Sequence, residues 1–163
     1  LSVAWPGRLE YFCLADGKQV ECPAEDAIGQ PASFRRYLLD GAHNPAGVES
    51  LIDALVSEFR YEHLILVWGC MGDKDVAATL TAIAPLAERI IFTRPESERS
   101  ATPEQLAAIL PEEERGKALS APTVIEALAM AADMAQSGDL ICVAGSLYLV
   151  GAARNILLGE VAP

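Results

Sequence analysis

The stretch YLLDGAHNPAGVESL, residues 37–51, passes from an apolar run into a helical pattern through one short turn. The apolar run ends at Asp40, and apolar residues then recur at three- and four-residue steps from Val48 onward. Asn44 suits a helix N-cap and Pro45 suits the first helical turn. The stretch therefore predicts a strand, a tight turn and a helix, which is the repeating unit of an α/β fold.

The same alternation runs through the rest of the chain. Strands are predicted at 8–14, 34–41, 63–70, 89–94, 116–121 and 139–145, and helices at 46–59, 76–86, 124–135, 147–158 and from Thr102 onward. Short continuous apolar runs are typical of parallel strands covered on both faces. We predict one α/β, Rossmann-like domain over residues 1–163. Its six-stranded sheet is mostly parallel, helices cover both faces, and the first strand is an antiparallel edge. Residues 16–33 are predicted to be a long loop.

Composition limits the partners. The formal net charge is -11 and the pI about 4.5, which argues against a nucleic-acid partner or an anionic membrane surface. An anionic small ligand is still compatible with this charge, because local cations can line a pocket. No apolar run is long enough for a membrane-spanning helix, so no membrane partner is expected.

The start of the chain lacks both a Met and the pattern of a signal peptide, so we expect a segment of a longer protein. The four cysteines fit no zinc motif, and Cys13, Cys70 and Cys142 lie in apolar runs, where cysteine usually behaves as a small hydrophobe. A reducing cytoplasm is the simplest interpretation.

Polar residues gather in the turns that follow the predicted strands, at the edge where open parallel sheets bind ligands. Asp40 could accept hydrogen bonds from a ribose diol, and His43 could bind a phosphate or carboxylate or act as an acid or base. Ser146 could cap its helix or help to bind an anion. Arg99 is a candidate for binding a carboxylate, although a solvated loop arginine is the default for both Arg94 and Arg99.

Two familiar sites are excluded by spacing. In GCMGDKD, residues 69–75, Asp73 separates Gly72 from Lys74 and no Ser or Thr follows, so the turn is not a Walker A loop. A turn with an acidic helix start is the plain alternative. No metal site is expected, because His63 precedes a strand and does not share a turn with His43.

Several motifs occur together in order: WPGRLEY, DGAHNPAG, GCMGDKD, TRPESERSA and AGSLYLVGAARN. In this set the chain closely resembles the C-terminal domain of folylpolyglutamate synthase and bifunctional dihydrofolate synthase, within the Mur-type amide ligases. The resemblance covers nearly the whole chain. It implies an enzyme that joins L-glutamate to dihydropteroate or folate in the cytoplasm. ATP first converts the acceptor carboxylate into an acyl phosphate.

The resemblance also implies partners and site residues. The phosphate loop, the Mg²⁺ ligands and the pterin pocket would belong to an N-terminal ATPase domain, so this chain alone is expected to be inactive. Arg8 and Asp40 match ATP-binding positions. Four other residues match motif positions assigned to glutamate or the acyl phosphate: His43, Ser146, Arg99 and Lys74. His43 is the one catalytic candidate, and no metal ligand is expected.

One departure from the family concerns residues 16–33, which make the separation of Arg8 and Asp40 larger than expected and resemble an insertion. If the insertion extends a hairpin tip, Arg8 keeps its place; if it displaces the first strand, the assignment of Arg8 fails. Two other functions stay open. One is the C-terminal domain of a peptidoglycan-branch Mur ligase, and the other is a non-catalytic nucleotide-sensing or interaction domain.

Overall fold

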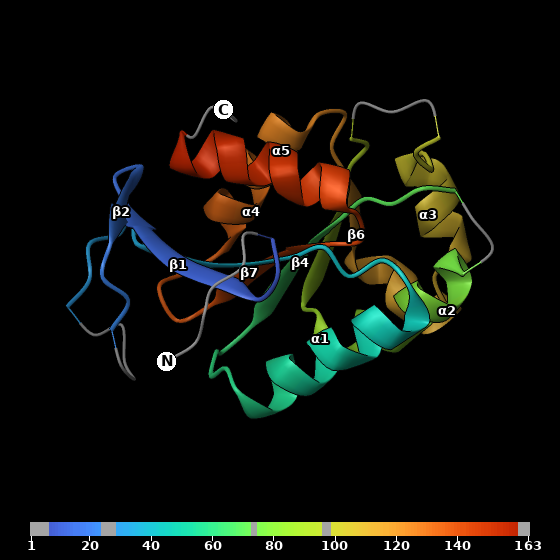
Figure 1. Ribbon diagram of the computed structural model, residues 1–163, viewed down its shortest axis with the longest axis horizontal. Helices are drawn as coiled ribbons and strands as arrows, with labels where there is room; N and C mark the ends of the chain where they lie inside the picture. Colours follow the sequence, from blue (N-terminus) through green and yellow to red (C-terminus); the bar gives the residue numbers. More distant parts are fainter. Residues whose placement is uncertain (1–6, 24–28, 73–74, 96–98, 160–163) are drawn as a thin grey trace.

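The central feature of the computed structural model is one sheet with the strand order β2-β1-β3-β7-β4-β5-β6 (Figure 1). The structure describes residues 7–23, 29–72, 75–95 and 99–159. Within these residues the strands are β1 (Glu10–Ala15), β2 (Lys18–Val20), β3 (Arg35–Asp40), β4 (Leu64–Trp68), β5 (Arg89–Phe92), β6 (Ala118–Ser120) and β7 (Leu140–Ala144). The helices are α1 (Pro45–Ser57), α2 (Val76–Ile83), η1 (Ala84–Leu86), α3 (Pro103–Ile109), η2 (Glu112–Lys117), α4 (Val124–Met134) and α5 (Leu147–Leu158).

Strands β3, β7, β4, β5 and β6 are parallel, as predicted. The last residues of the three central strands lie in one row, because Asp40 and Trp68 both pair with Ala144. The turns that follow these strands therefore leave the sheet at the same edge, which we call the carboxyl edge. The opposite edge, where the parallel strands begin, is the amino edge.

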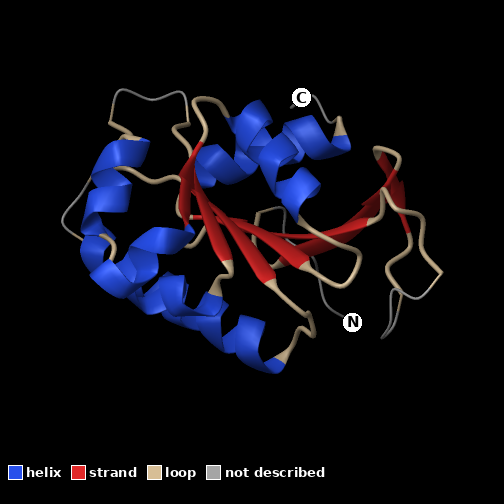
Figure 2. Ribbon diagram, turned by 180° about the vertical axis from the view of Figure 1, so that it is seen from behind, coloured by secondary structure: helices blue, strands red, loops and turns tan. Residues whose placement is uncertain are grey.

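Helices cover both faces of the sheet, which confirms the predicted α/β architecture (Figure 2). Alternate strand residues point to opposite faces, so Leu38 packs in the core under α1, α2 and α3, whereas Leu39 packs in the core under α4 and α5. Figure 1 shows α4 and α5 on one side of the sheet and α1 on the other. Both layers exclude water from β3, β7 and β4, which explains why these strands read as continuous apolar runs.

Helix starts follow their sequence signals. Asn44 Oδ1 accepts a hydrogen bond from Gly47 N at 2.8 Å, and Pro45 begins α1. Thr102 and Gln105 form the reciprocal bonds of a capping box at α3. These local signals place the helix starts where sequence predicted them.

The region predicted as one long loop contains strand β2, so the sheet has seven strands and not six. β2 forms an antiparallel hairpin with β1, and β1 pairs antiparallel with β3 from Glu10↔Leu39 to Leu14↔Arg35. The first strand is antiparallel, as predicted, but β2 takes the edge position. Alternation in the short segment 18–20 is too brief to distinguish a strand from a polar loop.

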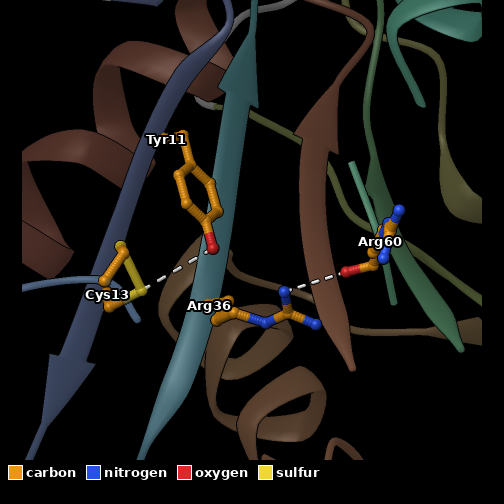
Figure 3. Close-up of a disulfide and its surroundings, with 5 residues drawn as sticks. Tyr11, Cys13, Arg36 and Arg60 are labelled. Atoms are coloured by element: carbon orange, nitrogen blue, oxygen red, sulfur yellow. Dashed lines mark hydrogen bonds between the residues drawn. A yellow bond between two sulfur atoms is a disulfide. The ribbon is translucent and has the colours of Figure 1, made fainter. Parts of the chain in front are cut away.

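A disulfide joins Cys13 to Cys22 across this hairpin, with their Cα atoms 5.3 Å apart (Figure 3). The expectation that Cys13 behaves only as a small hydrophobe was therefore wrong. The β1–β2 hairpin reverses the chain and brings Cys22 next to Cys13. The Tyr11 hydroxyl lies 3.9 Å from Cys13 Sγ and is the donor, since a disulfide sulfur carries no hydrogen. Cys70 and Cys142 are buried and take no part in a disulfide, as expected of cysteines in apolar runs.

Among the described residues, no helix is both long and apolar enough to cross a membrane.

Candidate functional site

Two neighbouring cavities lie at the carboxyl edge of the sheet. The first, which we call the β3 cavity, has a volume of about 380 Å³ and lies between the start of β1, the turn after β3 and the first half of α1. The second, the β7 cavity, has a volume of about 170 Å³ and lies between the turns after β4 and β7 and the start of α2. Both form where parallel strands end, which is the expected location of a ligand site in such a sheet.

The β3 cavity brings together Arg8 and Asp40, the two residues assigned to ATP. Asp40 is only 8% exposed, and its two carboxylate oxygens accept hydrogen bonds from Leu9 N at 2.9 Å and Ala42 N at 2.8 Å. The sequence predicted no structural role for Asp40, yet its hydrogen bonds attach the residue before β1 to the turn after β3. Each oxygen can accept more than one hydrogen bond, so these bonds leave acceptor capacity for a diol.

Arg8 keeps its place despite residues 16–33. In the described part of this segment, Lys18–Val20 form β2, which pairs with β1 on the side away from β3, and β1 pairs with β3 from Glu10 to Leu14. Arg8 is exposed, lines the β3 cavity and stands between Gly7 and Leu9, both of which have positive φ angles, 75° and 44°. The first strand is therefore not displaced from β3, which was the condition under which the assignment of Arg8 would fail, and the role of Arg8 in binding ATP stays a prediction.

His43 lines both cavities. Its side chain is exposed, and Nδ1 lies 2.9 Å from the carbonyl oxygen of Gly41. Because a carbonyl can only accept, this contact favours the tautomer with hydrogen on Nδ1 and a basic lone pair on Nε2. A group in either cavity would therefore lie beside the His43 ring.

Ser146 lines the β7 cavity and is 3% exposed. Its hydroxyl oxygen accepts hydrogen bonds from Tyr148 N at 3.1 Å and Leu149 N at 3.4 Å, so it caps α5. A hydroxyl that accepts two bonds still carries a hydrogen to donate. Capping and binding of an anion are therefore compatible at this residue.

Arg99 is exposed and does not line either cavity. Its carbonyl accepts a hydrogen bond from Gly72 N at 2.9 Å, and the neighbouring residue Ser100 bridges to Met71. The backbone of Arg99 therefore supports the turn after β4, which reaches the β7 cavity through Met71. Lys74 falls outside the described residues.

Sequence reasoning missed three features of the β7 cavity. Gly145 has a φ of 109°, and a Cβ atom there would lie 2.6 Å from the Gly69 carbonyl oxygen and 2.9 Å from the Trp68 ring. Leu147 and Tyr148 are 63% and 67% exposed although they are large and apolar, and both line the cavity. The only sequence signal for the close packing around Gly145 is a glycine directly after an apolar strand. No sequence signal distinguishes exposed from buried apolar residues at the start of α5.

One polar cluster lies away from the site. Glu62, His63 and Asp139 hold side-chain ligand atoms within 4.8 Å of one another, before β4 and β7 at the amino edge. Asp139 accepts bonds from His63 N at 3.1 Å and Gln136 N at 2.8 Å. These bonds explain the burial of Asp139 by the folding of the chain itself.

Comparison with known proteins gives the family. Residues 27–147 match the family described as "Mur ligase, glutamate ligase domain". The chain is 36% identical over 154 residues to a probable bifunctional folylpolyglutamate synthase/dihydropteroate synthase of Halobacterium salinarum, covering 94% of this chain and 16% of that protein. It is 32% identical over 150 residues to the dihydrofolate synthase/folylpolyglutamate synthase of Mycobacterium tuberculosis, covering 80% of this chain and 31% of that one.

A third relative belongs to another branch. The chain is 31% identical over 148 residues to the UDP-N-acetylmuramoyl-L-alanyl-D-glutamate–2,6-diaminopimelate ligase of a Synechococcus strain, covering 86% of this chain and 26% of that protein. The chain therefore spans only about a sixth to a third of the length of these curated relatives.

Solved structures agree with the fold. Mycobacterium tuberculosis folylpolyglutamate synthase complexed with ADP and AMPPCP superposes with a TM-score of 0.76 at 27% identity, covering 99% of this chain and 34% of that one. The Escherichia coli enzyme in complex with ADP superposes with a TM-score of 0.72 at 25% identity, covering 95% of this chain and 32% of that one. The parallel sheet, the motif order and the family match over most of its length lead to one conclusion: the chain belongs to the Mur ligase, glutamate ligase domain family.

Proposed function

We propose that the chain is the C-terminal, ATP- and glutamate-binding domain of a ligase that adds L-glutamate to dihydropteroate or folate through an acyl phosphate. The observation that carries the proposal is the joining of Arg8, Asp40 and His43 at one cavity from segments separated in sequence. Relatives named as folate ligases match nearly the whole chain and support the folate branch. Solved relatives with ADP and AMPPCP support a nucleotide substrate.

In this proposal the β3 cavity receives part of the nucleotide. Asp40 accepts hydrogen bonds from the ribose diol with the acceptor capacity that Leu9 and Ala42 leave to it. Arg8 donates to the phosphates, for which a guanidinium is well suited. The other part of the nucleotide site lies on the N-terminal ATPase domain of the same polypeptide.

The β7 cavity receives the glutamate or the acyl phosphate. Ser146 donates its hydroxyl hydrogen there, and His43 Nε2 accepts a proton from the glutamate ammonium group or holds that group by a hydrogen bond; the position of His43 beside the cavity supports this role. Amine attack on the acyl carbon forms the amide bond, breaks the bond to phosphate and releases inorganic phosphate. Lys74 and Arg99 are kept as candidates for binding the glutamate carboxylates.

The described residues that line the two cavities do not suit a Mg²⁺ ion. Asp40 is the only carboxylate among the described residues that line the two cavities, and both of its oxygens accept backbone hydrogen bonds. Mg²⁺ prefers several oxygen ligands in octahedral geometry. We assign Mg²⁺ binding to the N-terminal domain and the ATP phosphates, and no step here depends on it. A cytoplasmic location, where ATP and folates are available, stays a prediction.

The relative from Synechococcus favours one alternative, the C-terminal domain of a peptidoglycan-branch ligase. The test uses the full-length protein with ATP and either labelled glutamate plus dihydropteroate or tetrahydrofolate, or labelled 2,6-diaminopimelate plus UDP-N-acetylmuramoyl-L-alanyl-D-glutamate. The folate branch predicts glutamate incorporation only with the first two acceptors. Incorporation only into the muramoyl peptide would contradict it.

Two controls complete that test. The 163-residue chain alone should incorporate no glutamate; incorporation would contradict the need for an ATPase domain. A full-length protein that binds ADP but ligates neither amino acid to an acceptor would favour a nucleotide-sensing domain.

A further inference from the structure

The turn that carries Arg8 has an unusual backbone. Leu9 adopts a left-handed conformation with φ of 44°, which is uncommon for a residue with a branched side chain, and Gly7 has φ of 75°. Two left-handed residues therefore flank Arg8. A turn of this kind keeps its shape only where surrounding contacts hold it.

Three hydrogen bonds between described residues hold the turn. Gly7 O accepts from Gly41 N at 2.7 Å, and Leu9 N donates to Asp40 at 2.9 Å. The third runs from Gly7 N to Glu10 Oε1 at 3.0 Å. The first two attach the turn to the end of β3, whereas the third attaches it to a side chain on β1.

Glu10 is itself held by helix α5. Arg154 Nε lies 3.0 Å from both Oε1 and Oε2 of Glu10, and the two side chains are only 21% and 13% exposed. Limited exposure and a charged acceptor make such a pair stronger than a solvated one. The pair links α5, which begins at the β7 cavity, to the turn that lines the β3 cavity.

We propose that Glu10 and Arg154 are positioning residues that fix Arg8 at the β3 cavity. Neither lines that cavity, so both act through the backbone of the Gly7–Leu9 turn. Arg154 fixes the Glu10 carboxylate, and the carboxylate fixes Gly7 N. The backbone that carries the Arg8 guanidinium is therefore already ordered before a phosphate binds. Less conformational entropy is then lost on binding. The role of Arg8 as a phosphate ligand rests on the proposed function above.

The backbone part of the inference is tested by amide hydrogen exchange on this chain. Glu10→Ala and Arg154→Ala should accelerate exchange at Leu9 and Gly41 by about tenfold or more, because local opening of the turn becomes easier. Lys117→Ala is the matched control, since Lys117 pairs with Glu114 at similar exposure, 27% and 13%, away from the turn. Unchanged exchange at Leu9 and Gly41 in both variants would overturn the proposal.

The functional part is tested by ADP affinity of the full-length protein. Glu10→Ala should weaken ADP binding by about tenfold, Glu10→Gln should weaken it less because an oxygen still accepts from Gly7 N, and Lys117→Ala should not change it. In an Arg8→Ala background the effect of Glu10→Ala should vanish, because residues acting through one group are not additive. Equal effects of Glu10→Ala with and without Arg8 would overturn the positioning role.

The two tests separate the failure of this inference from that of the proposed function. If the unsubstituted full-length protein does not bind ADP, the proposed function fails while the exchange result still decides whether Glu10 and Arg154 hold the turn. If ADP binds and Arg8→Ala has no effect on its affinity, the positioning role for nucleotide binding fails.

Discussion

The two edges of the sheet carry similar polar residues, but these residues have different roles. Each has a buried aspartate that accepts backbone amide hydrogens, Asp40 at the carboxyl edge and Asp139 at the amino edge, with exposures of 8% and 5%. Each also has a histidine whose Nδ1 contacts an oxygen of the chain, His43 on Gly41 O and His63 on Asp139 Oδ1. A list of polar residues would not distinguish one edge from the other.

The surroundings do distinguish them. Asp40 and His43 line cavities, together with the exposed side chain of Arg8. Asp139 and His63 line neither of the two cavities, and the nearby Arg36 guanidinium donates to the carbonyls of Arg60 and Gly138, the first of these bonds being drawn in Figure 3. Asp139, His63 and Arg36 join segments of the chain at the amino edge, whereas Asp40, His43 and Arg8 at the carboxyl edge also face space that a ligand can fill.

The largest effect on stability should come from adding one methyl group at the carboxyl edge. The same change at the amino edge provides the comparison. At Gly145 a Cβ would lie 2.6 Å from a backbone oxygen, and φ is 109°, so Gly145→Ala should destabilise the chain by about 3 kcal/mol or more. At Gly138 the nearest atom to a Cβ, at 2.9 Å, belongs to the flexible Glu62 side chain. Gly138→Ala should therefore cost at most about 1 kcal/mol.

Urea unfolding of the two glycine variants measures the difference. Gly151→Ala serves as a control inside α5, where a Cβ has no neighbour within 4 Å, and it should stabilise by about 0.5–1 kcal/mol. Equal destabilisation by Gly145→Ala and Gly138→Ala would show that the close packing at the carboxyl edge can relax.

Next in size is the effect of the two aspartates on activity. In the full-length protein, Asp40→Ala removes the proposed ribose-binding group and two backbone contacts, so the proposed glutamate ligation should fall by about 30- to 100-fold. Asp139→Ala removes two backbone contacts and the contact with His63 Nδ1, none of them at either cavity, and should lower thermal stability while kcat/KM changes by less than about threefold. Steady-state kinetics at a temperature where both variants are folded tests this, and similar kinetic losses would remove the distinction between the edges.

Sequence reasoning anticipated much of this site because its signals are local. Apolar runs placed the parallel strands, and Asn44, Thr102 and Ser146 placed helix starts, since capping depends on residues within one turn. Because parallel strands end at one edge, the meeting of Asp40, His43 and Ser146 at neighbouring cavities followed from their positions after strands.

The features that sequence reasoning missed depend on contacts between distant segments. The bond from Leu9 N to Asp40 spans 31 positions, and the bond from Arg154 to Glu10 spans 144. The partner of Cys13 depended on a hairpin whose second strand has three residues and exposes all of them. Neither periodicity nor spacing can reveal such pairings before the register of the strands is known.

A smaller effect is expected from the disulfide. Cys13 pairs in register with Arg36, near the amino edge, whereas Arg8 lies beyond the other end of β1. Closing a loop with a sequence separation of 9 should stabilise the chain by about 2 kcal/mol, so Cys22→Ser should lower the free energy of unfolding by that amount. ADP affinity of the full-length protein should not change, because the Arg8 turn is held by Asp40 and Glu10.

Alkylation of the unfolded chain provides the check on this bond. Without reductant only Cys70 and Cys142 should be modified, and with reductant Cys13 and Cys22 should react as well. Loss of ADP affinity in Cys22→Ser would mean that the hairpin and the β3 cavity are coupled along β1, which would weaken the separation of the two edges.

The smallest effect links the carboxyl edge to pH. Burial raises the pKa of the Cys142 thiol above its ordinary value of 9.0, and the Asp40 carboxylate raises it further. The folded chain therefore holds this proton more tightly than the unfolded chain, so stability is fully present below pH 9 and falls as pH rises above it. Between pH 8 and pH 10 this group should remove about 1 kcal/mol of stability, and Cys142→Ala should reduce the decline by that amount.

Substitution of Asp40 and of Asp139 tests whether this pH dependence arises at the carboxyl edge alone. Asp40→Asn removes the charge that acts on Cys142 and should lower the pKa of its thiol, whereas Asp139→Asn should leave that pKa unchanged. Because burial is the larger cause, the thiol in Asp40→Asn should still titrate above 9. Absorbance of the thiolate during pH titration of the folded variants measures the shift. An equal change of the Cys142 pKa in both variants would show that charges at both edges of the sheet act on this thiol, and not only the Asp40 carboxylate.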